Sequence, residues 1–341
     1  MTTEPTQTDI KLGAQIAGCH LQINQRAANL VLENFSALTP GANFNVKRAL
    51  LNSDAPDFEI TDWVAENFNL PHLELHGHCL IQGGFALSRW YDLDGFYVED
   101  RIKSAIQATV ERYKGIIAEW DFLGEVVSPV GGLTNSFLRH KLGVDFPVKI
   151  FRWIREVDPD VPLYYSDYGM ESPDKLDAVL RFCQYLLAEG CDLAGIAIQF
   201  HHHSRGAINR MGIKRAVRST QALGLKAKLS EVTIWQDLTK LGSLAEQIQA
   251  HCYASLLELA IELKCQSYTF WAPFNSYSWR HPEESPGLWD FDFYPTLNFK
   301  EVEKICKKYN IKRGQTKDLV IGESSEKENF SETIATKNCC D

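Results

Sequence analysis

The sequence predicts a (β/α)₈ barrel, an α/β fold in which eight parallel strands form a single domain, and three observations support this prediction. Short apolar or alternating runs take turns along the chain with segments of helical periodicity. Eight such runs fit into about 300 residues, as this fold requires. Polar and aromatic residues fall near the ends of the runs, where barrels of this kind carry their working residues.

The expected strands and domain limits follow from this periodicity. The eight predicted strands are 12–18, 43–47, 72–81, 119–125, 163–168, 194–201, 226–234 and 267–274. An open, doubly wound sheet is the alternative, but no GxGxxG motif follows the first strand. We therefore expect one barrel domain over 12–313, an N-terminal extension over 1–11, and a disordered polar tail over 314–341.

Composition and charge exclude several classes of function. The 341-residue chain carries a formal net charge of -9 and lacks a cluster of Lys and Arg, which argues against a nucleic-acid partner. No apolar run reaches membrane-spanning length, so no membrane partner is expected. No secretory signal is visible at the start, which predicts a cytoplasmic protein, with secretion as the alternative. No pattern in the sequence indicates an oligomeric state.

Two glutamates occupy matching positions in the predicted barrel. Glu125 ends the strand at 119–125, and Glu231 lies near the end of the strand at 226–234. The two strands are the fourth and the seventh, so both carboxylates are expected at the mouth of the barrel. A retaining glycosidase needs one carboxyl group as acid and base and a second as nucleophile, about 5 to 5.5 Å apart. The pair therefore predicts hydrolysis of a glycoside.

The run His201-His202-His203 invites a metal-binding interpretation, because three imidazoles can bind zinc. Consecutive residues of a strand point to opposite faces, so at most His201 and His203 would converge. No HExxH motif or cysteine pair completes such a site. We expect neither a metal nor a cofactor.

Several stretches resemble, in order, the motifs of glycoside hydrolase family ten, the retaining endo-xylanases, between Leu12 and about Tyr309. The segment RYKGIIAEWDFLGE, which ends at Glu125, resembles the motif RYKGxxxxWDVVNE that ends in the family's general acid/base. The segments GHCLI (77–81), LYYSDY (163–168) and GIAIQFH (195–201) resemble GHxLV, LYxNDYN and GIGxQxH. Ser230-Glu231 resembles the first two residues of TELD, whose Glu is the nucleophile.

The resemblance implies a retaining endo-1,4-β-xylanase with Glu125 as acid/base, Glu231 as nucleophile and a β-linked oligo- or polysaccharide as substrate. Phe270-Trp271 and Ser278-Trp279-Arg280 resemble the family's WG and SWR, and an aromatic face stacks on a sugar ring. Strand ends and resemblance together give the expected sugar-binding residues: Lys47, His78, Tyr168, Gln199, His201, Trp271 and Trp279. Under this resemblance His202 and His203 belong to a loop.

The chain departs from the family at its reactive subsite. Gly124 stands where the family has an Asn that contacts the sugar 2-hydroxyl, and Gln82 and Gly83 replace a Trp and a His. Thr233 replaces an Asp that orients the imidazole of the family's QxH motif. Two alternatives therefore stay open: a barrel that binds carbohydrate with little or no turnover, and a glycosidase of the same mechanism that acts on another β-linked sugar.

Overall fold

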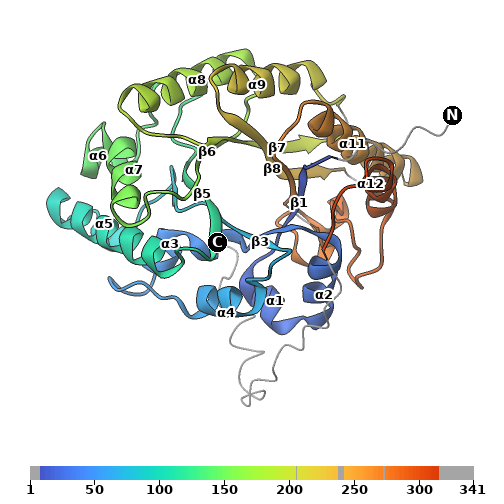
Figure 1. The fold of residues 1–341 in the computed structure, drawn as a ribbon, viewed down its shortest axis with the longest axis horizontal. Helices are drawn as coiled ribbons and strands as arrows, with labels where there is room; N and C mark the ends of the chain where they lie inside the picture. Colours follow the sequence, from blue (N-terminus) through green and yellow to red (C-terminus); the bar gives the residue numbers. More distant parts are fainter. Residues whose placement is uncertain (1–7, 205, 237–241, 272, 315–341) are drawn as a thin grey trace.

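Parallel strands form a closed ring at the centre of the protein, and helices surround it (Figure 1). The computed structural model describes residues 8–204, 206–236, 242–271 and 273–314. The strands are β1 (Lys11–Gln15), β2 (Ala37–Thr39), β3 (Glu74–Gly77), β4 (Ile81–Gln82), β5 (Ile117–Gly124), β6 (Leu163–Asp167), β7 (Gly195–His203), β8 (Lys226–Trp235) and β9 (Ser267–Phe270). Strands β3 and β4 both pair with β5 and share one position, so these nine strands build a barrel of eight positions. The predicted fold class is confirmed.

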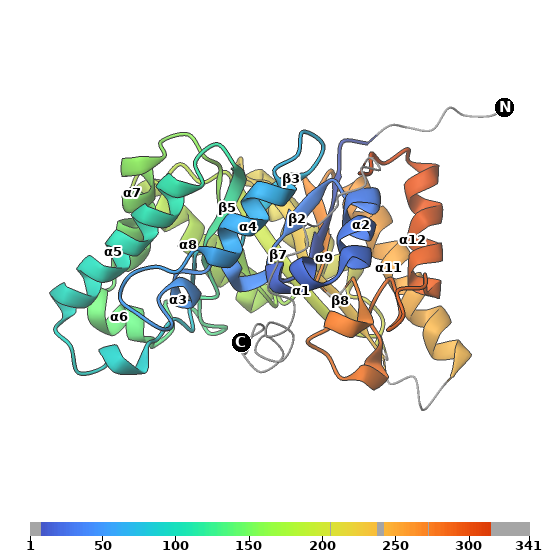
Figure 2. The ribbon, with the colours of Figure 1, turned by 90° about the horizontal axis from the view of Figure 1, so that it is seen from below.

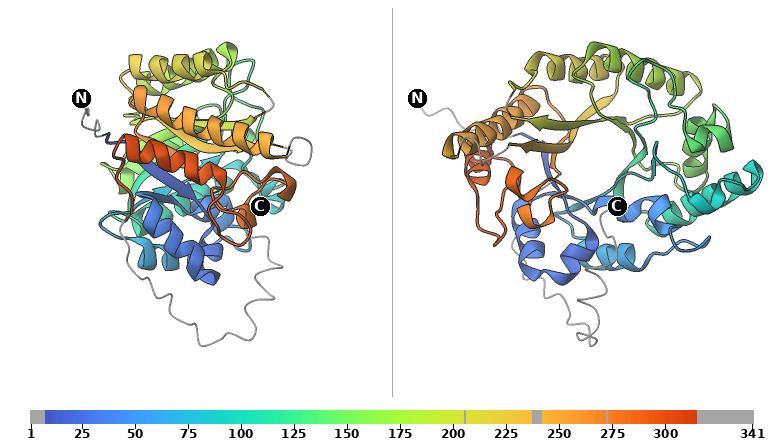
Figure 3. Two further views of the ribbon diagram at one scale, coloured as in Figure 1. Left: turned by 90° about the vertical axis from the view of Figure 1, so that its right-hand side faces the viewer. Right: turned by 180° about the vertical axis from the view of Figure 1, so that it is seen from behind.

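The helices cover the outside of the ring in chain order. They are α1 (Gly18–Ile23), α2 (Gln25–Asn34), α3 (Val46–Ala49), α4 (Glu59–Phe68), α5 (Gly95–Arg112), α6 (Phe137–Leu142), α7 (Phe146–Val157), α8 (Pro173–Ala188), α9 (Arg210–Ala222), α11 (Ser243–Glu262) and α12 (Leu297–Lys308). Figure 2 shows α2 and α12 on the same side of the barrel, and Figure 3 shows α11 and α12 side by side. Elements from the two ends of the chain therefore meet around β1. No helix among the described residues is long and apolar enough to cross a membrane.

Local sequence signals explain where the helices begin. The Asp94 carboxylate accepts a hydrogen bond from the Phe96 amide at 2.8 Å and caps α5. Pro173 stands in the first turn of α8, where its missing N–H leaves no helical hydrogen bond unmade. Because the polypeptide enters these helices directly from the loops that follow the strands, the caps also fix the mouth of the barrel.

The predicted second strand at 43–47 is wrong. The strand in that position is β2, which ends at Thr39, and Pro40 and Gly41 then turn the chain into a 3₁₀ helix over Gly41–Phe44. Asn45 caps α3 by accepting a hydrogen bond from the Lys47 amide at 2.8 Å. The alternation of polar and apolar residues at 43–47 therefore belongs to two short helical turns.

Other predicted limits need smaller corrections. The run 72–81 splits into β3 and β4, and β7 continues to His203, so His202 and His203 belong to a strand and the loop predicted for them is wrong. Strand β1 begins at Lys11, inside the predicted extension 1–11. The predicted polar tail lies outside the described residues except for Gly314.

A close contact on the outer, helix-facing side of the barrel wall gives a stability test. A Cβ atom at Gly77 would lie 2.0 Å from Cε3 of the buried Trp120. We expect Gly77→Ala to lower the free energy of unfolding by about 1–3 kcal/mol, because the ring must move within a packed core. Urea denaturation would measure this loss. Gly84→Ala is the matched control, since a Cβ at Gly84 meets no atom within 4 Å; an equal loss in both variants would contradict the packing argument.

Candidate active site

Both predicted catalytic glutamates have a left-handed backbone. Glu125 directly follows the last residue of β5 and has φ of 58°, and Glu231 lies inside β8 with φ of 50°. Residues other than glycine rarely adopt this conformation, which costs on the order of 1–3 kcal/mol at each position. Such strain collects at functional sites. Four other described non-glycine residues have a positive φ, but Glu125 and Glu231 are the two that lie within or directly after a barrel strand.

Glu231 owes its direction to a β-bulge. Between the pairs Gln199–Ser230 and His201–Thr233, β7 advances by two residues and β8 advances by three. Strict alternation along β8 would send Glu231 to the face opposite Lys228, which points into the barrel. The extra residue and the left-handed backbone turn the Glu231 side chain into the mouth instead.

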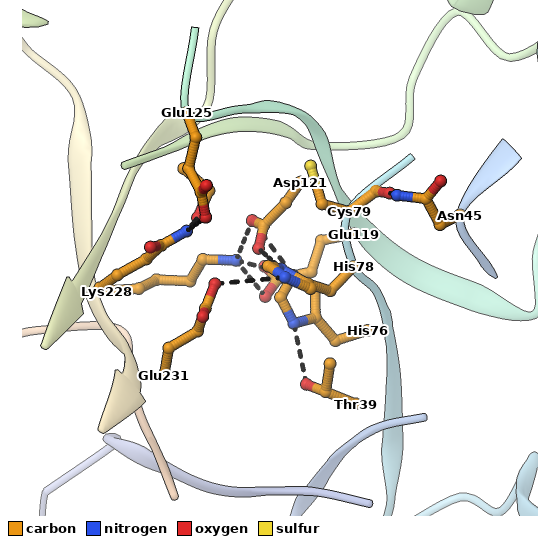
Figure 4. Close-up of polar contacts among 12 residues, drawn as sticks. Thr39, Asn45, His76, His78, Cys79, Glu119, Asp121, Glu125, Lys228 and Glu231 are labelled. Atoms are coloured by element: carbon orange, nitrogen blue, oxygen red, sulfur yellow. Dashed lines mark hydrogen bonds and ion pairs between the residues drawn. The ribbon is translucent and has the colours of Figure 1, made fainter. Parts of the chain in front are cut away.

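His78 connects the Glu231 carboxylate with a second buried carboxylate, that of Asp121. Its Nδ1 donates a hydrogen bond to Asp121 Oδ2 at 2.7 Å, and its Nε2 lies 3.2 Å from Glu231 Oε1. Figure 4 shows His78 between the two carboxylates. The three side chains come from β5, β8 and the segment that directly follows β3, so the contact joins separate parts of the barrel wall.

The charges of this group reinforce one another. Burial opposes ionisation of His78, but Glu231 and Asp121 outweigh it and raise the pKa of His78 to about 10. Burial also works against the Glu231 carboxylate, yet His78 and the hydrogen bond from His201 hold the pKa of Glu231 below its usual value. Glu231 is therefore a carboxylate, and His78 an imidazolium, at neutral pH.

Strand β7 contributes one contact to each of the two glutamates. The Gln199 amide donates hydrogen bonds to Glu125 Oε1 at 3.0 Å and to Ser166 Oγ at 3.2 Å. His201 Nε2 donates to Glu231 Oε2 at 3.3 Å. Gln199 and His201 thus orient the two carboxylates from one strand.

Thr233 stands where the family has an Asp, and this difference affects the hydrogen bonding of His201. Thr233 is the direct neighbour of His201 across β7 and β8, but its hydroxyl accepts a hydrogen bond from Trp279 Nε1 at 3.4 Å. Among the described residues, the buried Nδ1 of His201 has no hydrogen-bond partner. Thr233 therefore does not orient the imidazole.

The remaining predicted sugar-binding residues fall into two groups. Trp271 packs edge-on against His78, with ring centroids 4.7 Å apart, and Trp279 does the same against His201 at 5.3 Å. Each tryptophan thus packs on one of the two histidines that contact Glu231. Tyr168 follows β6 and is 45% exposed, while Lys47 is exposed on α3, away from the strand end where it was predicted.

The glycines that distinguish this site are packed tightly. A Cβ at Gly83 would lie 2.3 Å from the Glu125 carbonyl oxygen, and a Cβ at Gly124 would lie 2.9 Å from Cys79 Sγ. The Gly83 amide also donates to the Gly124 carbonyl at 2.7 Å. Neither glycine has room for a Cβ atom in this packing, so a side chain at either position would require its neighbours to move.

Sequence reasoning missed a group of ionisable side chains beneath the glutamates, formed by the buried His76, Asp121 and Lys228 and the half-buried Glu119. Lys228 Nζ lies 3.0 Å from Glu119 Oε1 and 3.3 Å from Asp121 Oδ1. The available signal was alternation, because Glu119 and Asp121 are two residues apart on β5 and so point to one side. Across the described residues, no cluster of three or more His, Cys, Asp or Glu side chains could hold a metal ion.

The mouth of the barrel carries two glutamates with a left-handed backbone, and histidines keep one of them ionised. These are the groups that an O-glycosyl hydrolase needs. The chain belongs to glycosyl hydrolase family 10, whose family model matches residues 3–305. The family predicted from the sequence motifs is thereby confirmed, and the protein is assigned as an O-glycosyl hydrolase.

Relatives of known name agree with this assignment. A β-1,4-xylanase of Dictyoglomus thermophilum is 26% identical over 318 residues, covering 86% of this chain and 87% of that protein. Endo-1,4-β-xylanase A of Caldicellulosiruptor saccharolyticus is 25% identical over 316 residues, covering 87% of this chain and 92% of that protein. Xylanase 10B from Thermotoga petrophila RKU-1, solved with xylobiose, shares the fold with a TM-score of 0.80 at 21% identity, over 90% of this chain and 99% of that one.

The raised pKa of His78 predicts a pH dependence of stability. The pKa rises from 6.5 to about 10 on folding, so the protonated His78 stabilises the fold fully below pH 6.5 and this contribution is lost as pH rises through 10. We expect the free energy of unfolding of the wild type to fall between pH 6.5 and 10, and this fall to be smaller in His78→Gln. Urea denaturation at several pH values would measure both slopes.

The exposed His140 provides the control for this measurement. His140→Gln should keep the wild-type slope, because it leaves the buried group intact. Parallel slopes for the wild type and His78→Gln would contradict the proposed protonation of His78.

Proposed function

We propose that this hydrolase cleaves a β-1,4-linked polysaccharide of the xylan type by double displacement, with retention of the anomeric configuration. Glu231 attacks the anomeric carbon while Glu125 donates a proton to the leaving oxygen. Glu125 then takes a proton from the water that releases the sugar from Glu231. The observation that carries the proposal is the ionised, buried Glu231 between His78 and His201.

The contacts of Glu231 suit the second step of this mechanism. When Glu231 becomes a glycosyl ester it loses its negative charge, so His78 keeps only Asp121 as a charged partner. Departure of the sugar restores the carboxylate and its ion pair with His78. His78 therefore weakens Glu231 as a nucleophile and improves it as a leaving group.

The rebuilt subsite favours a second candidate substrate, another β-linked sugar cleaved by the same mechanism. Neither Gly83 nor Gly124 has space for the side chain that the family carries there. The contacts that those side chains make to a xylose unit are therefore absent, and a sugar with a different pattern of substituents is the alternative.

A panel of soluble xylans, β-glucans and aryl β-glycosides tests both candidates. Wild-type turnover of xylan with retained configuration, followed by NMR of the first product, supports the xylanase proposal. Turnover of glucan alone supports the second candidate. Binding without turnover of any substrate would overturn both and leave a barrel that only binds carbohydrate.

The role of Glu231 predicts chemical rescue. We expect Glu231→Gly to remove turnover of aryl glycosides almost completely, and added azide to restore it with inverted configuration, because the anion enters the space of the lost carboxylate. Kinetics with and without azide, and NMR of the glycosyl azide, would measure this. A folded variant that azide does not rescue would exclude Glu231 as the nucleophile.

Glu125→Ala is the matched variant for the second glutamate. It should still release a good leaving group in the first step, where no proton is needed, while the second step slows for lack of a base. An equal loss of rate on good and poor leaving groups would argue against Glu125 as acid/base.

The packing of Gly124 predicts that the family's Asn cannot be introduced here by a single substitution without loss of activity. Gly124→Asn should lower kcat/KM about tenfold on the best wild-type substrate, because the new Cβ overlaps Cys79 Sγ, and overpacking costs about 1–3 kcal/mol. Adding Cys79→Ala should recover most of this loss. Steady-state kinetics of the two single variants and the double variant would measure the coupling, and additive losses would contradict it.

A further inference from the structure

The interior of the barrel contains a lysine that the proposed mechanism does not use. Lys228 is 1% exposed, and its ammonium group lies 3.0 Å from Glu119 Oε1 and 3.3 Å from Asp121 Oδ1. The same group lies 3.7 Å from the ring centroid of Tyr164. A buried lysine needs such compensation, and its charge is stabilised here by the two carboxylates.

Asp121 is the link between this lysine and the catalytic site. Its Oδ1 contacts Lys228 and lies 3.2 Å from His76 Nε2, while its Oδ2 accepts the hydrogen bond from His78. Figure 4 shows Lys228 reaching from β8 to Asp121, with His78 extending from Asp121 to Glu231. One oxygen of the Asp121 carboxylate is thus anchored by Lys228 and His76, and the other oxygen binds His78.

We propose that Lys228 is a positioning residue for glycoside hydrolysis, which acts by anchoring Asp121 so that His78 keeps the nucleophile Glu231 oriented and charged. This inference rests on the proposed function, because it takes Glu231 as the nucleophile. Lys228 itself touches no reacting atom; it acts through Asp121 and His78.

The ionisable groups around Lys228 decide the sign of the effect. Glu119 and Asp121 face it from β5, His76 from β3 and Tyr164 from β6. His78 and Glu231 lie beyond Asp121. Removing the positive charge of Lys228 raises the pKa of every acid nearby, whereas removing the negative charge of Glu119 lowers it. The two changes together leave the net charge of the group unaltered.

A charge-balanced pair of variants tests this proposal. In Lys228→Met, the acid limb of the kcat/KM profile, which reports ionisation of Glu231, should move to higher pH. The shift should be smaller than the roughly one to three units that an opposite charge in direct contact produces, because Lys228 acts on Glu231 through Asp121 and His78. In Glu119→Gln the limb should move to lower pH. The double variant should return toward the wild type. A merely structural role predicts additive damage and no such reversal.

A second readout does not depend on activity. The ¹³C signal of the His78 ring in histidine-labelled protein reports its titration, which should move up in Lys228→Met and down in Glu119→Gln. If neither titration moves, or both move in one direction, the proposal is overturned. If the wild type cleaves no glycoside but the titrations shift as expected, the coupling through Asp121 holds and the proposed function fails. If Lys228→Met does not fold, Glu119→Gln and the double variant still carry the test.

Discussion

The ion pair of His78 with Asp121 and Glu231 is the interaction on which the rest of the site depends. Charges buried in a barrel are tolerated only with partners in good geometry, and removing one partner leaves the others uncompensated. His78 holds both carboxylates, at 2.7 Å and 3.2 Å. The charge of Glu231, the proposed nucleophile, and the anchoring of both carboxylates therefore depend on the same imidazole.

The fold could be predicted from the sequence because strand and helix periods differ clearly over most of the chain. The prediction failed at 43–47, where alternation of polar and apolar residues also fits short helical turns. Pro40 and Gly41 were the signal that the strand had already ended. Local pattern alone does not distinguish these alternatives when the segment is only a few residues long.

The site was predictable in part. The order of the motifs pointed to Glu125, Glu231, His78, Gln199 and His201. In the structure, His78 and His201 contact Glu231, and Gln199 contacts Glu125. It was not possible to predict that Lys228 and Asp121 meet, because their contact depends on how strands far apart in the sequence are staggered across the barrel. Nor could substitution patterns show that the backbone at Gly83 packs on the carbonyl of Glu125.

The bulge at Glu231 makes strand length a functional variable of this enzyme. Three residues of β8 span the distance that two residues of β7 cover. A deletion of one residue there would restore regular pairing and leave the later residues of β8 with their present partners on β7. The one residue left between Ser230 and Thr233 would then alternate to the helix-facing side, so no glutamate at that point could reach the interior. The extra residue in this strand, as well as the glutamate itself, therefore limits how the gene for this barrel can vary.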